Sequence, residues 1–161
     1  MRFFRSSHRV EPVHHGDLGP LTSLYSRTWA AAGSAVGPGL LDEVSAPCEE
    51  ITAWLRGGFE LYRTQHDGVI VGAVRLSFPS GVCYLDRLAV DPELWRRGHG
   101  RALVGYAISR ARRAGVPRVW TQSTLGLDAA RALFATFGFR EQGRITPHYW
   151  REPILLLERS V

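Results

Sequence analysis

The chain has 161 residues, 45% of them hydrophobic and 22% charged, a composition that excludes a disordered chain and predicts a folded globular domain. No apolar run is long enough to cross a membrane, and no apolar stretch of a signal peptide follows the basic N-terminus. We therefore expect a single domain over residues 1–161, cytoplasmic and without membrane contact. All 20 basic residues behind the net charge of +5 are arginines, and they favour an anionic partner, either nucleic acid or a phosphorylated cofactor.

The thiol and imidazole groups show no metal-binding or disulfide pattern. Cys48 and Cys83 have no Cys-x-x-Cys or Cys/His spacing, and His14-His15 lacks the spacing of metal ligands. We therefore expect no metal. Cys83 lies in a strand-like run and is expected to be a small buried apolar residue.

The first part of the chain alternates helical periodicity with turn residues. A first strand is predicted over residues 9–13, and the apolar spacing of residues 18–32 predicts a helix. Residues 33–39, rich in Gly and Pro, form a break. A second helix is predicted over residues 47–56, with Glu49 and Glu50 at its positive end and Gly57-Gly58 after it.

Strands then dominate until a long helix. Three strands are predicted over residues 59–63, 69–76 and 82–90. They precede a helix to about residue 114, a strand over 116–120, a helix over 128–137 and two closing strands near 139–145 and 153–159. This order predicts an α/β (α+β) fold: a mixed, mostly antiparallel sheet of about seven strands with helices on both faces.

The turn before the long helix has the chemistry of a phosphate site. Gly98-His99-Gly100 opens the helix, whose first N–H groups lack intrahelical partners and whose dipole adds positive charge. Glycine lets an anion approach those amides closely. Arg96, Arg97 and Arg101 add guanidinium groups that can bind phosphate oxygens in pairs.

The turn therefore suits a pyrophosphate, and the alternative is a tight turn with a solvated basic rim. Two other nucleotide motifs are excluded. A P-loop requires a lysine, which the chain lacks, and a dinucleotide-binding fingerprint requires Gly or Ala where Leu103 stands.

Two motifs in order resemble the GNAT acetyltransferases. Leu88-Ala89-Val90-Asp91-Pro92, followed by the segment from Arg97 to Leu103, resembles the central motif of that family. The segment from Ala129 to Arg140 is similar to its second motif, which usually ends in Leu-Tyr-x-x-x-Gly-Phe. The order of elements along nearly the whole chain also matches.

The resemblance implies an N-acetyltransferase that uses acetyl-CoA as co-substrate and a small-molecule or peptide amine as acceptor, in one direct attack within a ternary complex. It implies a bulged fourth strand that splays from the fifth, with the pantetheine arm in the gap. The acceptor enters from the opposite side, under the loop that joins the first two helices, and a homodimer is compatible with the family. The implied cofactor-binding residues are Leu88, Ala89, Val90, Arg96, Arg97, Gly98, His99, Gly100, Arg101, Ala102 and Phe134.

The chain departs from the family pattern at two positions. Trp95 stands where the family usually has Gln or Arg, three residues before the first glycine. Phe134 replaces the tyrosine that often acts as general acid, so it can pack against the pantetheine arm but cannot donate a proton. An acyl-CoA-binding module without catalysis is therefore the alternative function. A nucleic-acid-binding protein is not expected, because the chain has no recognition motif.

Aminolysis of a thioester needs a base more than an acid. An amine with a pKa near 10.4 is mostly protonated at neutral pH, whereas a thiol with a pKa near 8.5 leaves readily as thiolate. Asp86 is the candidate base and shares a strand face with Tyr84; alternatively Asp86 pairs with a nearby arginine. The replacement acid is Tyr84, His148 or Tyr149, although the last two equally suit a core or dimer contact. We expect His99 to be a packed imidazole.

The acceptor is weakly specified by the sequence. Asp42, Glu43, Glu49 and Glu50 lie near the loop that covers the acceptor in the family. They either attract a cationic amine or are solvated charges at helix ends.

Overall fold

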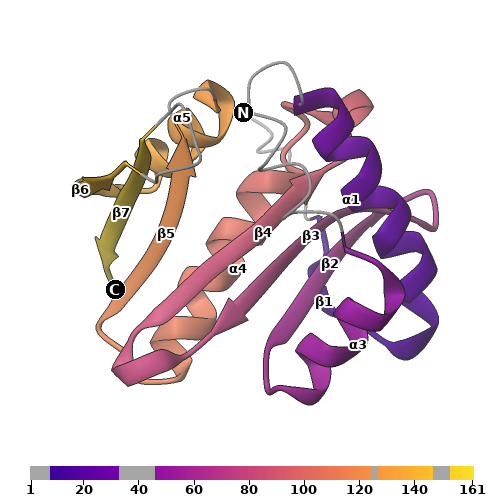
Figure 1. Ribbon diagram of the computed structural model, residues 1–161, viewed down its shortest axis with the longest axis horizontal. Coiled ribbons are helices and arrows are strands. Elements are labelled where there is room, and N and C mark those ends of the chain that lie inside the picture. The colour runs from indigo at the N-terminus through magenta and orange to yellow at the C-terminus, as the bar shows by residue number, and fades with distance from the viewer. Residues whose placement is uncertain (1–7, 33–45, 125–126, 147–152) are drawn as a thin grey trace, which may run out of the picture.

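The centre of the protein is one seven-stranded sheet with the order β1-β2-β3-β4-β5-β7-β6 (Figure 1). The computed structural model describes residues 8–32, 46–124, 127–146 and 153–161. Neighbouring strands are antiparallel except β4 and β5, which are parallel. The strands are β1 (Glu11–Pro12), β2 (Glu60–His66), β3 (Val69–Ser77), β4 (Cys83–Val90), β5 (Arg118–Thr124), β6 (Arg140–Ile145) and β7 (Ile154–Ser160).

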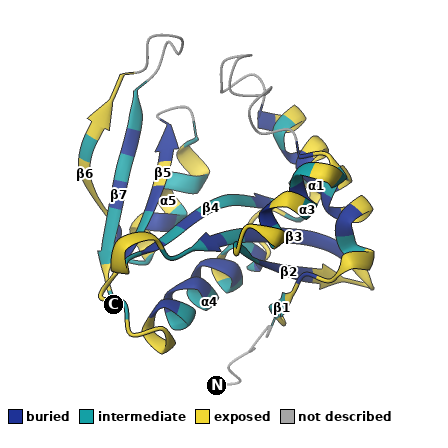
Figure 2. Cartoon of the chain, turned by 60° about the horizontal axis from the view of Figure 1, so that its bottom comes forward, coloured by how far each residue is buried: buried dark blue, intermediate teal, exposed yellow. Residues whose placement is uncertain are grey.

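Helices cover both faces of the sheet (Figure 2). On one face, α1 (Leu18–Ala32) and α3 (Cys48–Arg56) enclose a core that includes Leu21, Leu24 and Ile51. On the other face, α4 (His99–Arg113) and α5 (Asp128–Thr136) cover a second core that includes Leu103 and Val119. The predicted fold class is therefore confirmed, because each helix buries the apolar stripe that its periodicity indicated.

Three strands differ in length from the prediction. The strand expected over residues 59–63 continues to His66, because β3 pairs with it as far as Val69. The strand expected over residues 116–120 begins at Arg118 and continues to Thr124, because β7 pairs with it along its whole length. The first strand is shorter than predicted, Glu11–Pro12, because proline has no N–H group to donate to a further strand hydrogen bond.

Cys83 is fully buried, as predicted, and desolvation raises the pKa of its thiol to about 12.

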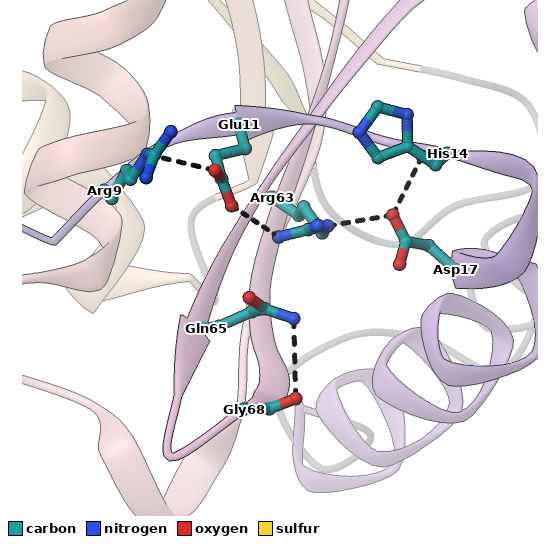
Figure 3. Close-up of polar contacts among 7 residues, drawn as sticks. All are labelled: Arg9, Glu11, His14, Asp17, Arg63, Gln65 and Gly68. Carbon is teal, nitrogen blue, oxygen red and sulfur yellow. Dashed lines mark hydrogen bonds and ion pairs between the residues drawn. The ribbon is translucent and has the colours of Figure 1, made fainter.

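A buried arginine ties the first strand to the start of α1 (Figure 3). Arg63 of β2 donates from Nε to Asp17 Oδ2 at 2.8 Å and from Nη1 to Glu11 Oε2 at 3.1 Å. The backbone N–H of His14 donates to the same Asp17 oxygen at 2.8 Å. Hydrogen bonds from His14 and Arg63 lower the pKa of Asp17 despite its desolvation. The network fixes the edge of the sheet far from β5.

No helix in the described ranges combines the length and the apolarity that a bilayer crossing requires. Four residues named above, Asp42, Glu43, His148 and Tyr149, lie outside the described part of the chain.

Candidate active site

The fourth strand contains a β-bulge at Arg87. Arg75 of β3 faces Asp86 and Ala73 faces Ala89, so one residue of β3 between them is matched by two on β4. Arg87 has a φ of 50°, in the left-handed region that non-glycine residues rarely adopt. The hydroxyl of Tyr25 in α1 donates to the Arg87 carbonyl at 3.0 Å and holds the bulge in place.

Beyond the bulge, β4 and β5 separate. Their pairing covers three positions and ends at Leu85 and Thr121. From there the two strands diverge toward the top of Figure 1. The other edge of β5 remains paired with β7 as far as Thr124, so β4 is the strand that bends away. The splay that the resemblance implied is therefore present, and it leaves an open backbone edge on β4.

The glycine turn lies where β4 ends. A short 3-10 helix, η3 (Pro92–Leu94), leads through Trp95 to Arg96, whose φ is 62°, and to Gly98, whose φ is 95°. α4 then starts at His99, and its first backbone bond runs from Ala102 N to Gly98 O. The amides of residues 99–101 thus have no intrahelical acceptor and are available to an anion.

Arginine side chains surround these amides. Arg96 and Arg97 are exposed, and their guanidinium groups form no ion pair among the described residues. Arg101 is also exposed and lies over the Phe137 ring, with its guanidinium carbon 5.3 Å from the ring centre. A Cβ at Gly100 would lie 3.0 Å from Leu133 Cδ2, so glycine allows α4 to approach α5 closely here. The turn therefore offers free amides and exposed positive charge to a pyrophosphate.

His99 points into the protein and away from this surface. Its side chain is 1% exposed, stacks on His8 with ring centres 3.9 Å apart, and hydrogen bonds to Thr64 Oγ1 at 3.1 Å. Desolvation, followed by the nearby His8 and His66, lowers the pKa of His99 to about 4. The expectation of a packed imidazole is confirmed, and only the backbone amide of His99 is placed to face a phosphate.

Asp86 is paired with an arginine, which was one of the two alternatives left open by the sequence. Arg75 Nε donates to Asp86 Oδ1 at 2.8 Å, and Arg75 Nη2 donates to Asp86 Oδ2. The Arg75 guanidinium lies between the rings of Trp54 and Phe59, 4.4 and 4.3 Å from their centres. This stacking orients Asp86 firmly on β4.

Tyr84 is half-buried, two residues before Asp86 on the same strand. Desolvation and then the charge of Asp86 raise the pKa of Tyr84 to about 12, so its hydroxyl keeps its proton at neutral pH. Phe134 is 2% exposed and packs edge-on against Phe139, with 5.3 Å between ring centres.

Two buried polar atoms on β5 lack partners in the described part of the chain, Trp120 Nε1 within the segment that pairs with β4 and Thr124 Oγ1 beyond it. Trp120 Nε1 and Thr124 Oγ1 are buried and form no hydrogen bond among the described residues. By strand alternation they lie on the same face of β5. Unpaired buried polar groups are costly and mark places where a ligand or water completes the bonding.

A cavity of about 410 Å³ lies between α1 and the start of α3, on the side where the resemblance implies the acceptor. Its lining is formed by Thr22, Tyr25, Ser26, Trp29, Ala30, Ala46 and Pro47. Glu49 is exposed, whereas Glu50 Oε1 lies 3.7 Å from Arg87 Nη2. Glu50 is therefore partly neutralised by the protein itself.

Sequence reasoning missed three residues of this region: Tyr25, Arg75 and Arg87. In the sequence, Tyr25 fits the apolar spacing of the first helix, and Arg75 is an ordinary polar residue of a predicted strand. Their roles depend on the bulge register, which no local periodicity encodes.

Comparison with known proteins identifies the family. A sequence model of the acetyltransferase (GNAT) family matches residues 22–139. The chain is 53% identical to a mycothiol acetyltransferase of Gordonia bronchialis over 49 aligned residues. This aligned segment covers 30% of this chain and 15% of that protein. Over 57 residues it is 39% identical to the [ribosomal protein bS18]-alanine N-acetyltransferase of Escherichia coli K12, 35% of this chain and 38% of that protein. The chain thus spans less than half the length of either relative.

Solved structures share the fold. The PaiA N-acetyltransferase of Thermoplasma acidophilum, solved in complex with coenzyme A, superposes with a TM-score of 0.79 and 13% identity. The superposition covers 95% of this chain and 98% of that one. The matched family segment contains α1, the bulged β4, the glycine turn and α5. This chain belongs to the GNAT family of acetyltransferases.

Proposed function

We propose that the protein transfers an acetyl group from acetyl-CoA to a primary amine by direct attack within a ternary complex. The observation that carries this proposal is the bulge at Arg87, which opens the edge of β4 beside a turn of free amides. An open strand edge suits an extended amide-containing arm, and the turn suits a pyrophosphate. Coenzyme A contains both groups.

The residues present fit such a ligand. The amides of His99, Gly100 and Arg101 would face the pyrophosphate, with Arg96 and Arg97 as counter-charges. The edge of β4 from Leu88 to Val90 would pair with the arm. On β5, beyond the last β4–β5 pair, Thr124 Oγ1 is buried without a hydrogen-bond partner among the described residues, and a ligand could supply one. Acetyl-CoA supplies a thioester, whose carbonyl carbon accepts the amine and whose thiol is a good leaving group.

Asp86 remains the proposed proton acceptor. It is the single carboxylate of β4, and its carboxylate can accept about four hydrogen bonds, of which Arg75 uses two. The clamp by Arg75 fixes the direction of the remaining lone pairs, so a water or the ammonium group can donate to them. Tyr84 is the proposed proton donor to the leaving sulfur, because its hydroxyl stays protonated at neutral pH.

The proposed acceptor is an amine of a small molecule or a protein. The relatives reported above are, by their names, a mycothiol acetyltransferase and an N-acetyltransferase for an alanine of ribosomal protein bS18. Among the described residues, the cavity beside Tyr25 is lined by aromatic, hydroxyl and small side chains and by no carboxylate. Glu50 is engaged by Arg87, so the described part of the lining suits a neutral or aromatic group next to the amine better than a polycation.

A second candidate function is acyl-CoA binding without turnover. Phe134 supports it, since the hydroxyl usual at this position is missing and the ring is buried in the core. The two functions share one cofactor site and differ only in proton transfer.

Release of free thiol from acetyl-CoA, followed with a thiol reagent, tests the proposal on a panel of amines. The panel contains small aromatic and aliphatic amines, polyamines and peptides with a free N-terminal alanine. We expect at least one non-polycationic amine to accelerate thiol release above the rate without amine. Binding of acetyl-CoA by calorimetry, with no acceleration by any amine, would favour the binding module instead.

A further inference from the structure

Trp95 is a large apolar side chain that the fold leaves nearly half exposed. It follows η3 in the segment between β4 and the glycine turn, and 46% of its surface is exposed. Its indole Nε1 donates a hydrogen bond of 2.7 Å to the Val90 carbonyl oxygen. This is the one side-chain hydrogen bond of Trp95 among the described residues, and it holds the indole N–H against the end of β4.

The Val90 carbonyl belongs to the open edge of β4. Asp91 N donates to Val71 O at 2.7 Å, so the backbone groups of Asp91 point toward β3. Successive residues of a strand direct their backbone groups to opposite edges, and Val90 therefore directs its carbonyl away from β3. On that side β5 has already diverged, because the last β4–β5 pair is Leu85 and Thr121.

Both lone pairs of this oxygen are engaged. Besides Trp95, Thr28 Oγ1 of α1 donates to it at 3.3 Å. A carbonyl oxygen has two lone pairs, so an incoming N–H must displace one donor. Thr28 is 8% exposed and held within α1, whereas Trp95 is exposed and lies outside regular structure. Trp95 is the donor that can leave.

We propose that the ligand displaces Trp95 from the Val90 carbonyl oxygen. In the free protein the indole N–H donates to this oxygen, and in the complex an amide N–H of the pantetheine arm donates to it instead. This inference rests on the proposed binding of acetyl-CoA. One hydrogen bond replaces another, so the indole competes with the ligand and lowers its affinity.

Trp95→Phe tests the competition, because it keeps an aromatic ring and removes the N–H. Calorimetry with CoA and with acetyl-CoA should give a Kd about two- to tenfold lower for the variant, the range of one net hydrogen bond. Without ligand the variant should melt at a lower temperature than the wild type. With saturating CoA its melting temperature should rise by more degrees than that of the wild type.

Fluorescence provides a second readout. The emission of the wild type minus that of Trp95→Phe should change when CoA saturates both proteins, since the indole leaves its acceptor. Tyr62→Phe is the matched control: it removes a 2.7 Å hydrogen bond from an aromatic side chain to Glu60, away from the site, so its loss should not change the Kd for CoA.

An equal or higher Kd for Trp95→Phe, or an unchanged difference spectrum, would overturn the inference while leaving the proposed function intact. Failure of the wild type to bind CoA and acetyl-CoA would instead overturn the proposed function, and this inference with it.

Discussion

The hydroxyl of Tyr25 donates to the carbonyl of Arg87, linking α1 to the bulge of β4 across 62 positions of the chain. The Tyr25 side chain is fully buried, and desolvation raises the pKa of its hydroxyl, which therefore remains a donor at all physiological pH values. This contact couples the helix that lines the acceptor cavity to the strand edge that we assign to the cofactor.

Removing this hydroxyl should loosen the site as well as the fold. Tyr25→Phe leaves the Arg87 carbonyl without its donor, at a cost of about 1–3 kcal/mol in the free energy of unfolding. The Kd for acetyl-CoA should also rise, because the bulge is less firmly held. Tyr62→Phe is the matched control, since it removes a 2.7 Å hydrogen bond to Glu60 away from the site. Urea unfolding and calorimetry of both variants measure the two effects, and equal loss of affinity in both would contradict the coupling.

Asp86→Asn should reduce catalysis if Asp86 accepts the ammonium proton. We expect kcat/KM at neutral pH to fall by about 10²- to 10⁴-fold, with a smaller loss at high pH, where more of the amine is already free. Asp67→Asn, in the exposed β2–β3 turn, should leave kcat/KM unchanged. A near-normal kcat/KM for Asp86→Asn at every pH would contradict the role of Asp86 as general base. Asp86 would then have only a structural role, as the ion-pair partner of Arg75.

Tyr84→Phe tests the proton donor. Because the thiolate leaves readily without help, we expect kcat to fall only about tenfold, toward the low end of general-acid effects. Tyr106→Phe, on α4 beside Tyr62, should not change kcat. An unaltered kcat for Tyr84→Phe would transfer the role to the segment that contains His148.

Burial of His99 should make the protein less stable as pH falls. The pKa of His99 is about 4 in the folded state and near 6.5 in the unfolded chain, so between these values the unfolded chain binds the extra proton. The contribution of neutral His99 to the free energy of unfolding is fully present above pH 6.5 and is lost as pH falls toward 4. This loss amounts to about 2–3 kcal/mol. His99→Leu should therefore show a weaker decline in unfolding free energy between pH 7 and 4 than the wild type. Parallel declines would contradict a neutral, buried His99; His8 and His66 lie beside this position in both proteins.

Much of this fold follows from local patterns in the sequence. The stripe of Leu103, Val104 and Ala107 predicts which face of α4 is buried, and the Gly98 turn marks where α4 begins. Both are local properties of spacing and backbone freedom. The site depends on contacts between residues that are far apart in the sequence or set by strand pairing. Arg75 binds Asp86 because the β3–β4 register places the two residues opposite each other. That register, and the bond from Trp95 to Val90, arise from tertiary packing that no single segment encodes.

The central claim is that the Gly98 turn binds the pyrophosphate of acetyl-CoA, and calorimetry of Gly98→Glu against Gly58→Glu tests it most directly. Both glycines have left-handed φ values, 95° and 85°, so the substitutions impose similar backbone strain, and only the first places a carboxylate at the turn. We predict that the wild type and Gly58→Glu bind acetyl-CoA and that Gly98→Glu does not. Equal affinity in the two variants would contradict the claim.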